Sequence, residues 1–518
     1  MIEIISQARL SAARRRFLKQ GIGWGLSSCL AGCGGRRVAS GAVGSTDPTP
    51  TTPTTPVTPT PPQPPQPPAL PNPQPTPSGA LTAATATVSS VEIAPVDGAF
   101  CGLSFEKSEL VSRVFATPDV NMINLFKALG ASIMRIGGSA VDKVIWTPDG
   151  KGRQGKQISK IDLNNFAAFV KQTGWQVIYG INLAQGTETA AAEEAAYAAQ
   201  VLGDKLYCFE LGNEPNSYKL DGYTPPAGTT WSYTTFRDKW VLLRNAILQA
   251  APNATFAGPD ATDGNIAAYT VPFAADMGSN LKLLSQHYYR IGDTTPATLS
   301  LLLSAPDTTL VTKLATVKGA ADKAGVPYRL TETSSVTSGG AVGVSDVYGS
   351  ALWALDHLLT SAVAGASGVH FHGGSAANYT PFTFGSDQVT AVRPEYYGLL
   401  FFTMMGQGKV LASTINAGGL NISAYSIKTS AGISTLFINK EASQSFRVAL
   451  QYPGSFSKIT AIHLTAPGLS STTGIQIQGA AISLDFGLGA MNAPYDLYGG
   501  QQTNVNVPAM TAVLVKAS

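Results

Sequence analysis

The chain has 518 residues, which is more than one ordinary domain holds, although a single barrel can take up about 250 residues or more. Hydrophobic residues make up 44% and charged residues only 13%, so core-forming material is ample and the low charge density argues against a nucleic-acid-binding protein. The formal net charge of +3 is uneven, because the first 32 residues hold five basic residues and one acidic residue, and the remainder is near neutral.

The first segment, residues 1–32, has the features of an export signal. Residues 14–19 (RRRFLK) resemble the twin-arginine export motif, and the apolar run over 21–30 is too short to span a bilayer. The run ends in the sequence LAGC, which is similar to a bacterial lipobox with Cys33 as the lipidated residue. We expect an exported lipoprotein, tethered to a membrane through Cys33 in the periplasm or at the cell surface. The alternative is a helix of the folded domain.

The remaining cysteines and the histidines give no sign of a metal site or of a disulfide framework. Cys101 and Cys208 each lie in an apolar, strand-like run, which is typical of buried free thiols. The five histidines are scattered along the chain without metal-ligand spacing. We therefore expect no metal and no cofactor.

Residues 33–79 are predicted to be a linker. From 46 to 78 the sequence is almost wholly Pro, Thr and Gln, a composition that cannot bury a core and favours an extended spacer of about 3.1 Å per residue. About thirty such residues would hold the folded body roughly 90–100 Å from its anchor. Such a spacer suits access to large substrates, and it equally suits passage through a cell wall.

A regular alternation of strand and helix patterns fills residues 97–407. Eight short apolar runs end in polar turns, and amphipathic stretches separate them, which predicts a (β/α)8 TIM barrel of the α/β class. The expected strands lie at 99–106, 132–138, 176–183, 206–215, 255–261, 283–289, 328–334 and 368–374. The expected helices include 161–173, 190–202, 234–250, 347–364 and 394–405.

Residues 408–518 change to short alternating runs with many turn signals, which predicts an antiparallel β-sandwich. Residues 80–96 contain a similar run and are expected to add a strand to this sandwich before the chain enters the barrel. A carbohydrate-binding module is the alternative to a simple packing partner of the barrel.

Three glutamates follow barrel strands: Glu106 after the first, Glu214 after the fourth and Glu332 after the seventh. The carboxyl ends of these strands meet at one mouth, so Glu214 and Glu332 are expected to face each other. A retaining glycosidase needs such a pair about 5–5.5 Å apart, one as proton donor and one as nucleophile. Apolar neighbours favour a protonated carboxyl at Glu214, which predicts the acid/base there and the nucleophile at Glu332. An isolated Glu214 would more simply be a solvated loop residue.

Polar neighbours of these glutamates extend the hypothesis. Asn213 is placed to hydrogen-bond a sugar 2-hydroxyl, an interaction that strengthens in the transition state. His287, Tyr288 and Tyr289 end the sixth strand, where a hydroxyl is expected to hold Glu332 ionised and correctly oriented. A packed aromatic is the alternative for Tyr288.

Five motifs in order resemble the heparanase and β-glucuronidase family, glycoside hydrolase family 79, within the larger clan of retaining barrel glycosidases. They are RIGGSAVD (135–142), GNEPN (212–216), GPD (258–260), QHYY (286–289) and ETSSVTSGGAVGVSD (332–346). The resemblance runs from about 90 to 518. It implies a barrel with an attached sandwich that acts on glycans containing β-linked glucuronic acid. We expect the protein to be a monomer.

The resemblance also implies roles for further residues. Gly339, Gly340 and Tyr379 would receive the C6 carboxylate of the sugar, since glycine amides can approach it closely. One departure weakens the preference for a uronate, because Thr337 stands where the family usually has Tyr and Ser338 where it often has Gly.

Glu106 and Asp142 occupy positions that, by the resemblance, bind sugar hydroxyls. The alternative is that they cap or pair at the surface with the neighbouring Lys107 and Lys143.

Two other functions stay open. One is a clan-related glycosidase for a neutral sugar, and the other is a surface lipoprotein that binds glycans without cleaving them. Exo and endo cleavage are not distinguished, because the motifs have few basic neighbours to mark a track for a sulfated chain. Those neighbours are Lys107, Lys143, Lys219 and Arg290.

Overall fold

The computed structural model of the chain describes residues 69–374, 377–385, 387–484 and 487–518. The predicted export signal, its Cys33 and most of the predicted linker lie outside these ranges. Among the described residues, no helix combines the length and the apolar character needed to cross a bilayer.

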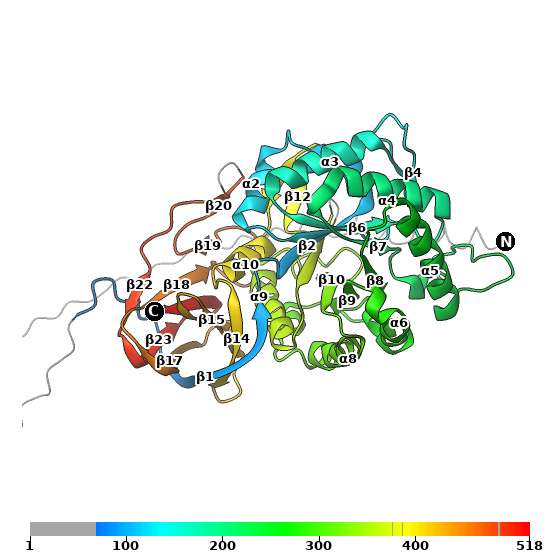
Figure 1. The fold of residues 1–518 in the computed structure, drawn as a ribbon. Coiled ribbons are helices and arrows are strands. Elements are labelled where there is room, and N and C mark those ends of the chain that lie inside the picture. Colours follow the sequence, from blue (N-terminus) through cyan, green and yellow to red (C-terminus); the bar gives the residue numbers. More distant parts are fainter. Residues whose placement is uncertain (1–68, 375–376, 386, 485–486) are drawn as a thin grey trace, which may run out of the picture. The chain divides into compact units, whose positions relative to one another are not determined.

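Parallel strands close into an eight-stranded barrel, of which Figure 1 labels β2 and β6 to β10. The last barrel strand, β11, pairs with β2 and closes the ring. Each expected strand supplies one of the barrel strands, so the prediction of a TIM barrel is confirmed. The barrel strands are β2 (Cys101–Glu106), β3 (Ile133–Gly137), β6 (Gln176–Ile181), β7 (Leu206–Leu211), β8 (Phe256–Ala261), β9 (Leu283–Ile291), β10 (Tyr328–Val336) and β11 (Val369–Gly373).

Helices surround the barrel, and their ends follow local sequence signals. In α3 (Lys160–Thr173), Ser159 and Asp162 form a reciprocal capping box, and Gly174 ends the helix in a left-handed conformation. The other helices are α2 (Val120–Ala128), α4 (Glu188–Leu202), α5 (Tyr233–Ala250), α6 (Val271–Met277), α7 (Leu299–Leu303), α8 (Thr308–Ala324), α9 (Tyr348–Val363) and α10 (Pro394–Thr403). Two short two-stranded sheets lie outside the barrel. In one, β4 (Ile145–Trp146) pairs in parallel with β5 (Gln157–Ile158), and in the other β12 (Phe382–Phe384) pairs antiparallel with β13 (Val389–Val392).

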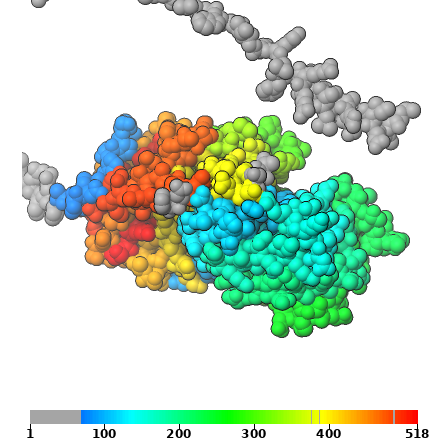
Figure 2. Space-filling view, turned by 90° about the horizontal axis from the view of Figure 1, so that it is seen from above, coloured from blue at the N-terminus to red at the C-terminus, as the bar shows by residue number. Residues whose placement is uncertain are grey.

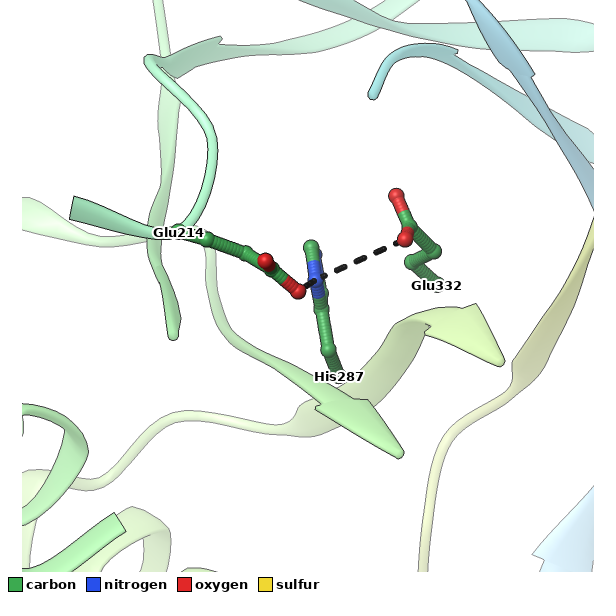
Figure 3. A group of neighbouring side chains, drawn as sticks. All are labelled: Glu214, His287 and Glu332. Atoms are coloured by element: carbon green, nitrogen blue, oxygen red, sulfur yellow. Dashed lines mark hydrogen bonds and ion pairs between the residues drawn. The ribbon is translucent and has the colours of Figure 1, made fainter. Parts of the chain in front are cut away.

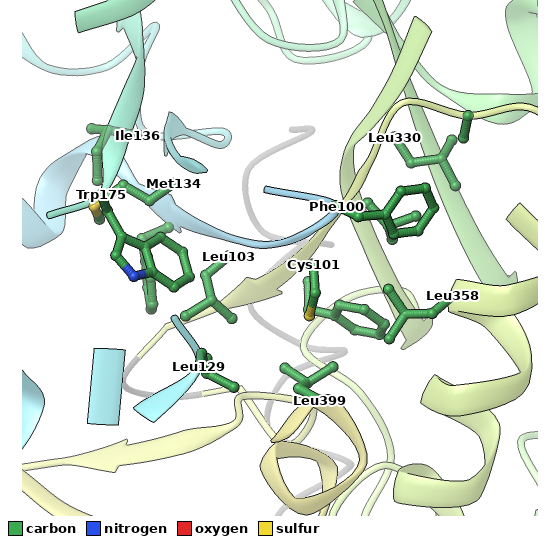
Figure 4. Close-up of a cluster of buried hydrophobic side chains, with 14 of the residues drawn as sticks. Phe100, Cys101, Leu103, Leu129, Met134, Ile136, Trp175, Leu330, Leu358 and Leu399 are labelled. Atoms are coloured by element: carbon green, nitrogen blue, oxygen red, sulfur yellow. The ribbon is translucent and has the colours of Figure 1, made fainter. Parts of the chain in front are cut away.

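The barrel core lies between the strands and the helices. Figure 4 shows Leu103 and Cys101 of β2 between Trp175 on one side and Leu399 of α10 on the other. These side chains are buried, and the indole of Trp175 donates to the carbonyl of Phe126 at 3.1 Å. Both Cys101 and Cys208 are buried and free, as predicted. The middle of each strand is buried on both of its faces. The ends of the strands are less covered, and the polar residues of the cavity described below lie at their carboxyl ends.

The C-terminal region forms a ten-stranded sheet with its own apolar core. It differs from an all-antiparallel sandwich at one place, since β1 pairs antiparallel with β14 and parallel with β17. The hydrogen-bonded strands are β1 (Leu81–Val96), β14 (Gly408–Asn416), β15 (Ile422–Thr429), β16 (Gly432–Asn439), β17 (Ser445–Phe456), β18 (Ile459–Thr465), β19 (Gln476–Ile477), β22 (Tyr495–Leu497), β23 (Gly500–Val507) and β24 (Thr511–Ala517). A separate small hairpin joins β20 (Ile482–Ser483) and β21 (Gly487–Leu488). Figure 2 shows the blue start of the described chain among the orange and red residues of this sheet.

The last residues of the predicted linker belong to the folded body, which corrects its boundary at 79. The backbone N–H of Asn72 donates to Asp496 at 3.0 Å, and the Gln74 side chain lies 2.7 Å from the His463 ring. Gln74 also exchanges hydrogen bonds with the backbone of Asn506. Composition alone missed this docking because Pro and Gln are as frequent here as in the spacer.

A buried ion pair connects the sheet to the barrel. Lys440, just after β16, places its ammonium 2.6 Å from the carboxylate of Asp356 in α9. The hydroxyl of Tyr425 donates to the same carboxylate at 2.6 Å. Because both charges are paired and hydrogen bonded, this contact fixes the sheet against the outer face of the barrel.

Candidate active site

A cavity of about 640 Å³ lies at the carboxyl ends of the barrel strands. It is lined by residues that end or directly follow the strands, together with residues from the loops and from α8. They are Glu106, Ser139, Glu214, Thr262, Asp263, His287, Tyr288, Tyr289, Arg290, Gly292, Asp293, Thr309, Lys313, Glu332, Thr337, Ser338, Gly339, His372 and Tyr379. The sequence-predicted Glu106, Glu214, His287, Tyr288, Glu332, Gly339 and Tyr379 therefore come together.

Glu214 and Glu332 approach each other across this cavity with His287 between them (Figure 3). One carboxylate oxygen of each glutamate and a ring nitrogen of the histidine all lie within 4.8 Å of one another. Glu332 lies within β10 and His287 within β9, whereas Glu214 lies on the turn after β7.

The turn that carries Glu214 has an unusual backbone. Gly212 has φ +80°, and a Cβ there would lie 2.1 Å from the hydroxyl of Tyr218, so the position requires glycine. Glu214 itself has φ +47°, a strained conformation for a residue with a side chain. Its N–H donates to the carbonyl of Asp260 at 3.0 Å, which ties the turn to the next barrel strand.

The burial expected at the end of this strand falls on a different glutamate. The Glu214 side chain is about 25% exposed, whereas Glu210, within β7, is fully buried. The apolar run in the sequence therefore surrounds Glu210, and Glu214 lies beyond it at the cavity wall.

Asp142 does not lie at the cavity, contrary to the role in sugar binding that the resemblance implied. Its buried carboxylate accepts hydrogen bonds from the backbone of Leu183 at 2.9 Å, of Ala184 at 2.8 Å and of Asn213 at 3.0 Å. The hydroxyl of Tyr218 donates to it as well, at 2.8 Å. Asp142 thus fixes the turn that presents Glu214. Because it is buried, it does not form the surface pair with Lys143 that was the alternative.

His287 links Glu214 to a buried carboxylate. Its Nδ1 lies 2.9 Å from Glu214, and its Nε2 lies 3.1 Å from Asp260. Burial alone would lower the pKa of His287, but the nearby carboxylates of Glu332 and Asp260 outweigh it and raise the pKa well above the usual value. The ring is therefore a cation that orients Glu214.

Glu332 lies among groups that favour its ionised form. Arg135 donates to one carboxylate oxygen at 2.8 Å and Tyr289 donates to the other at 2.9 Å. The rings of His372 and His287 lie 3.7 and 3.8 Å away. Burial acts to raise the pKa of Glu332, yet the two histidines, the guanidinium and the tyrosine hydroxyl together lower it to about 2.

Arg135 is a functional candidate that the sequence interpretation quoted in a motif but gave no role. Its fully buried guanidinium contacts Glu332, Asn213 at 2.8 Å, Glu210 at 2.5 Å and the carboxylate of Asp260. Burial raises the pKa of Glu210 well above its usual range, whereas Arg135 and His287 outweigh burial and hold that of Asp260 well below. The sequence did contain a signal for this ion pair, since Arg135 and Glu210 carry opposite charges inside two apolar strands. A buried charge requires a partner of opposite charge.

Asn213 is buried beside the cavity rather than in its wall. Its Oδ1 accepts the hydrogen bond from Arg135, so Nδ2 is the group that it can offer to a ligand.

Glu106 lies in the wall, accepts a hydrogen bond from the Ala140 backbone at 2.7 Å and faces His372 at 3.5 Å. Lys107 instead forms a buried pair with Glu194 at 2.5 Å, so the surface pairing considered for Glu106 does not occur.

The two tyrosines at the end of β9 point to opposite sides, as the strand period requires. Tyr289 reaches Glu332, while the hydroxyl of Tyr288 donates to Asp307 at 2.7 Å and its ring packs on His357. The expected hydroxyl partner of Glu332 is therefore Tyr289.

The glycine loop after Glu332 differs in detail from the expectation. Gly339 lines the cavity, and a Cβ there would meet nothing within 4 Å. Gly340 packs behind it, because a Cβ at that position would lie 2.9 Å from the backbone nitrogen of Tyr379. Thr337 donates its hydroxyl to Asp293 in the cavity wall.

The three central side chains have a spacing that a metal ion could use, so their fit to a metal has to be examined. Nδ1 of His287 is already hydrogen bonded to Glu214, and the guanidinium of Arg135 lies 2.8 Å from Glu332. A bound cation would have to displace that hydrogen bond and lie beside a permanent positive charge. These residues do not fit a metal site.

Comparison with known proteins gives relatives over about half of the chain, although no family model matches it. A β-glucuronidase from Aspergillus niger is 28% identical over 274 residues, which are 47% of this chain and 49% of that protein. A β-glucuronidase from Neurospora crassa is 26% identical over 253 residues, which are 43% of this chain and 44% of that protein. The chain is similar to the β-glucuronidase family. The resemblance inferred from its motifs is thereby confirmed, with the qualification that the chain spans about half the length of these curated relatives.

Solved structures share the fold over a longer range. A 4-O-α-L-rhamnosyl-β-D-glucuronidase from Fusarium oxysporum has a TM-score of 0.67 at 20% identity, covering 84% of this chain and all of the other. A family 51 arabinofuranosidase from Xanthomonas axonopodis pv. citri has a TM-score of 0.63 at 14% identity, with the same coverage. At these identities the likeness establishes the fold and leaves the sugar open.

Proposed function

We propose that the protein is a retaining glycoside hydrolase that cleaves β-linked glucuronic acid. The observation that carries the proposal is the pair Glu214 and Glu332, whose nearest carboxylate oxygens lie within 4.8 Å in a shared cavity. In retaining enzymes the two carboxyl groups lie about 5–5.5 Å apart, because one of them attacks the sugar directly. In inverting enzymes they lie farther apart, because a water must fit between the sugar and the catalytic base. The curated relatives named β-glucuronidase support the choice of sugar.

In the first step, Glu332 attacks the anomeric carbon while the bond to the leaving oxygen breaks. The pKa of about 2 keeps Glu332 ionised at neutral pH and therefore nucleophilic. The leaving oxygen takes the electron pair of the broken bond and the proton of the Glu214 carboxyl group. His287 orients that carboxyl group through its Nδ1. The sugar is then joined to Glu332 as an ester.

In the second step, Glu214 has lost its proton and acts as a base. It removes a proton from a water whose oxygen attacks the anomeric carbon, and the ester bond to Glu332 breaks. Arg135 and Tyr289 stabilise the carboxylate that leaves, since each keeps its hydrogen bond to Glu332. Two inversions at the same carbon leave the β configuration unchanged.

Recognition of the sugar rests on groups around Glu332. Gly339 and Tyr379 line the wall on the side of the nucleophile and offer a backbone amide and a hydroxyl to the C6 carboxylate. Asn213, which is buried beside the cavity, supports the site by accepting a hydrogen bond from Arg135 through its Oδ1.

A second candidate is the same reaction on a neutral sugar, and one observation favours it. Asp293 lines the cavity and accepts a hydrogen bond from Thr337, which places a negative charge beside the glycine loop. A carboxylate accepts hydrogen bonds from sugar hydroxyls but repels a uronate.

Hydrolysis of 4-nitrophenyl β-D-glucuronide, β-D-glucoside and β-D-xyloside by the purified protein separates the two candidates. We expect kcat/KM to be highest for the glucuronide, and Asp293→Asn to increase it further by removing the repulsion. A preference for a neutral sugar would overturn the assignment of the uronate. Binding of the glucuronide without product would favour a non-catalytic glycan-binding protein, and loss of activity with a chelator would contradict the absence of a metal from this mechanism.

A further inference from the structure

The cavity extends past Glu214 to an ion pair that the reaction above does not use. Asp263, directly after β8, and Lys313 of α8 both line the cavity, and their charged atoms lie 2.6 Å apart. Their side chains are 27% and 29% exposed, so both retain faces open to the cavity.

The pair is held in a fixed position. The ammonium of Lys313 lies 5.7 Å from the centre of the Tyr288 ring, in addition to its contact with Asp263. The neighbouring Thr262 accepts hydrogen bonds from Asn216 at 3.0 Å and from Asn265 at 2.8 Å. These bonds tie the loop of Asp263 to the turn of Glu214, so the pair belongs to the same wall as the proposed proton donor.

The chemistry of the first step determines what lies against this wall. The proton donor must touch the leaving oxygen, so the leaving group occupies the Glu214 side, and the cleaved sugar occupies the side of Glu332 and Gly339. One N–H of the Lys313 ammonium is used in the 2.6 Å contact with Asp263. The pair therefore presents the other carboxylate oxygen as an acceptor and up to two N–H donors, which matches two adjacent hydroxyls of a sugar ring.

The charges around the cavity restrict that leaving sugar further. Each basic side chain in the wall faces a carboxylate: Lys313 faces Asp263 at 2.6 Å, Arg290 faces Asp307 at 2.8 Å, His287 faces Glu214 at 2.9 Å and His372 faces Glu106 at 3.5 Å. Arg290 also donates to the carbonyls of Leu301 and Ser304. A sulfate on the leaving sugar would therefore compete with carboxylates that already neutralise these cations.

We propose that Asp263 and Lys313 form a subsite for the leaving sugar, and that this subsite selects a sugar with free hydroxyls over a sulfated one. The inference rests on the proposed hydrolysis of β-glucuronides. It makes the substrate an unsulfated glucuronate-containing oligosaccharide or polysaccharide.

The test uses the purified protein and three substrates. They are 4-nitrophenyl β-D-glucuronide, a disaccharide of glucuronic acid β-linked to an unsulfated hexose, and the same disaccharide sulfated on the hexose. We expect the wild type to hydrolyse the unsulfated disaccharide at least about tenfold faster in kcat/KM than the sulfated one, because a subsite built for hydroxyls rejects an analogue that cannot satisfy it.

Two variants change the charge of the subsite in opposite directions. Asp263→Asn frees Lys313, so we expect loss of about tenfold on the unsulfated disaccharide and a gain on the sulfated one. Lys313→Met is expected to slow both disaccharides, and both variants are expected to affect the nitrophenyl substrate much less. The matched control is Lys318→Met, which removes an exposed pair with Asp322 from the same helix and should leave all three rates unchanged.

The outcomes distinguish failure of this inference from failure of the proposed function. The proposed subsite is wrong if both variants change kcat/KM by the same factor on all three substrates. It is also wrong if Asp263→Asn does not increase kcat/KM on the sulfated disaccharide relative to the unsulfated one. In either case the proposed hydrolase function is unaffected. If the wild type hydrolyses none of the three substrates, the proposed function fails and this inference fails with it. Thermal unfolding of each variant excludes loss of fold as the cause.

Discussion

The surroundings of Glu332 and of Glu214 differ in the number of charged partners and in exposure to solvent. Glu332 is 8% exposed and lies near Arg135, His287 and His372, whereas Glu214 is 25% exposed and has one charged partner, His287, among the residues that the structure describes. The same type of side chain is thus given two environments in one cavity. The difference supports the proposed roles, because a nucleophile must stay ionised while an acid/base must exchange its proton with water during each cycle.

The supports behind the two glutamates differ as well. Glu332 is held by direct hydrogen bonds from Arg135 and Tyr289 to its carboxylate. Glu214 is held mainly through its backbone, since Asp142 fixes the N–H of Asn213 and the carbonyl of Asp260 fixes the N–H of Glu214. The proposed nucleophile is therefore held by two hydrogen bonds to its carboxylate, while the proposed proton donor is held through its backbone and by one side-chain contact, with His287.

The largest effect is expected from Glu332→Gln. The amide cannot attack the anomeric carbon, so kcat should fall by roughly ten-thousandfold or more on every glucuronide. Initial rates on 4-nitrophenyl β-D-glucuronide measure this, with the exposed Glu92→Gln in the C-terminal sheet as a control of equal charge change. Full activity of Glu332→Gln would falsify the proposed mechanism.

The next effect is expected from Glu214→Ala, and it should depend on the leaving group. Loss of the proton donor should cost roughly a hundredfold to ten-thousandfold on a disaccharide, and less on the nitrophenyl substrate, whose leaving group needs no proton. Azide fits the space left by the carboxylate and should restore turnover by forming a β-glucuronosyl azide. An α product, or equal losses on both substrates, would contradict the role of Glu214 as acid/base.

The pair of glutamates was predictable from the sequence because both follow from strand positions. Apolar runs of strand length mark where the chain crosses the barrel, and the polar residues at their ends must meet at one mouth. Positions 214 and 332 are separated by more than a hundred residues, yet the barrel fixes their approach without further information.

The supports of the pair were not predictable in the same way. Whether a strand residue points into the barrel or out of it depends on the register of the strands. The sequence therefore shows that Arg135 and Glu210 are charged, but it does not show that they contact each other. The resemblance gave Asp142 a role in sugar binding that the structure does not support. A carboxylate that accepts four hydrogen bonds from the protein cannot be told from one that binds sugar hydroxyls by its sequence alone. The docking of Asn72 and Gln74 was hidden by a composition typical of linkers.

His287→Asn should change the dependence of the rate on pH. Glu332 must be ionised, so activity is present above its folded pKa of about 2 and is lost as the pH falls through that value. Removal of the cation 3.8 Å away raises this pKa, and the acid limb of kcat/KM should therefore move to higher pH. His463→Asn, in the C-terminal sheet, is the control. An unchanged acid limb in His287→Asn would show that the histidine does not act on Glu332.

The smallest effect is expected from Tyr289→Phe, and it tests whether the hydroxyl matters beyond packing. The variant removes one hydrogen bond of 2.9 Å to the ionised Glu332, worth about 1.5–3 kcal/mol or roughly ten- to hundredfold in rate, and should also move the acid limb slightly to higher pH. Tyr288→Phe is the matched control, because its hydroxyl binds Asp307, the N-cap of α8. We expect that variant to lower Tm through the helix without moving the acid limb. If the two variants behave alike, the hydroxyl of Tyr289 contributes packing only, and the ionised state of Glu332 depends on Arg135 and the two histidines alone.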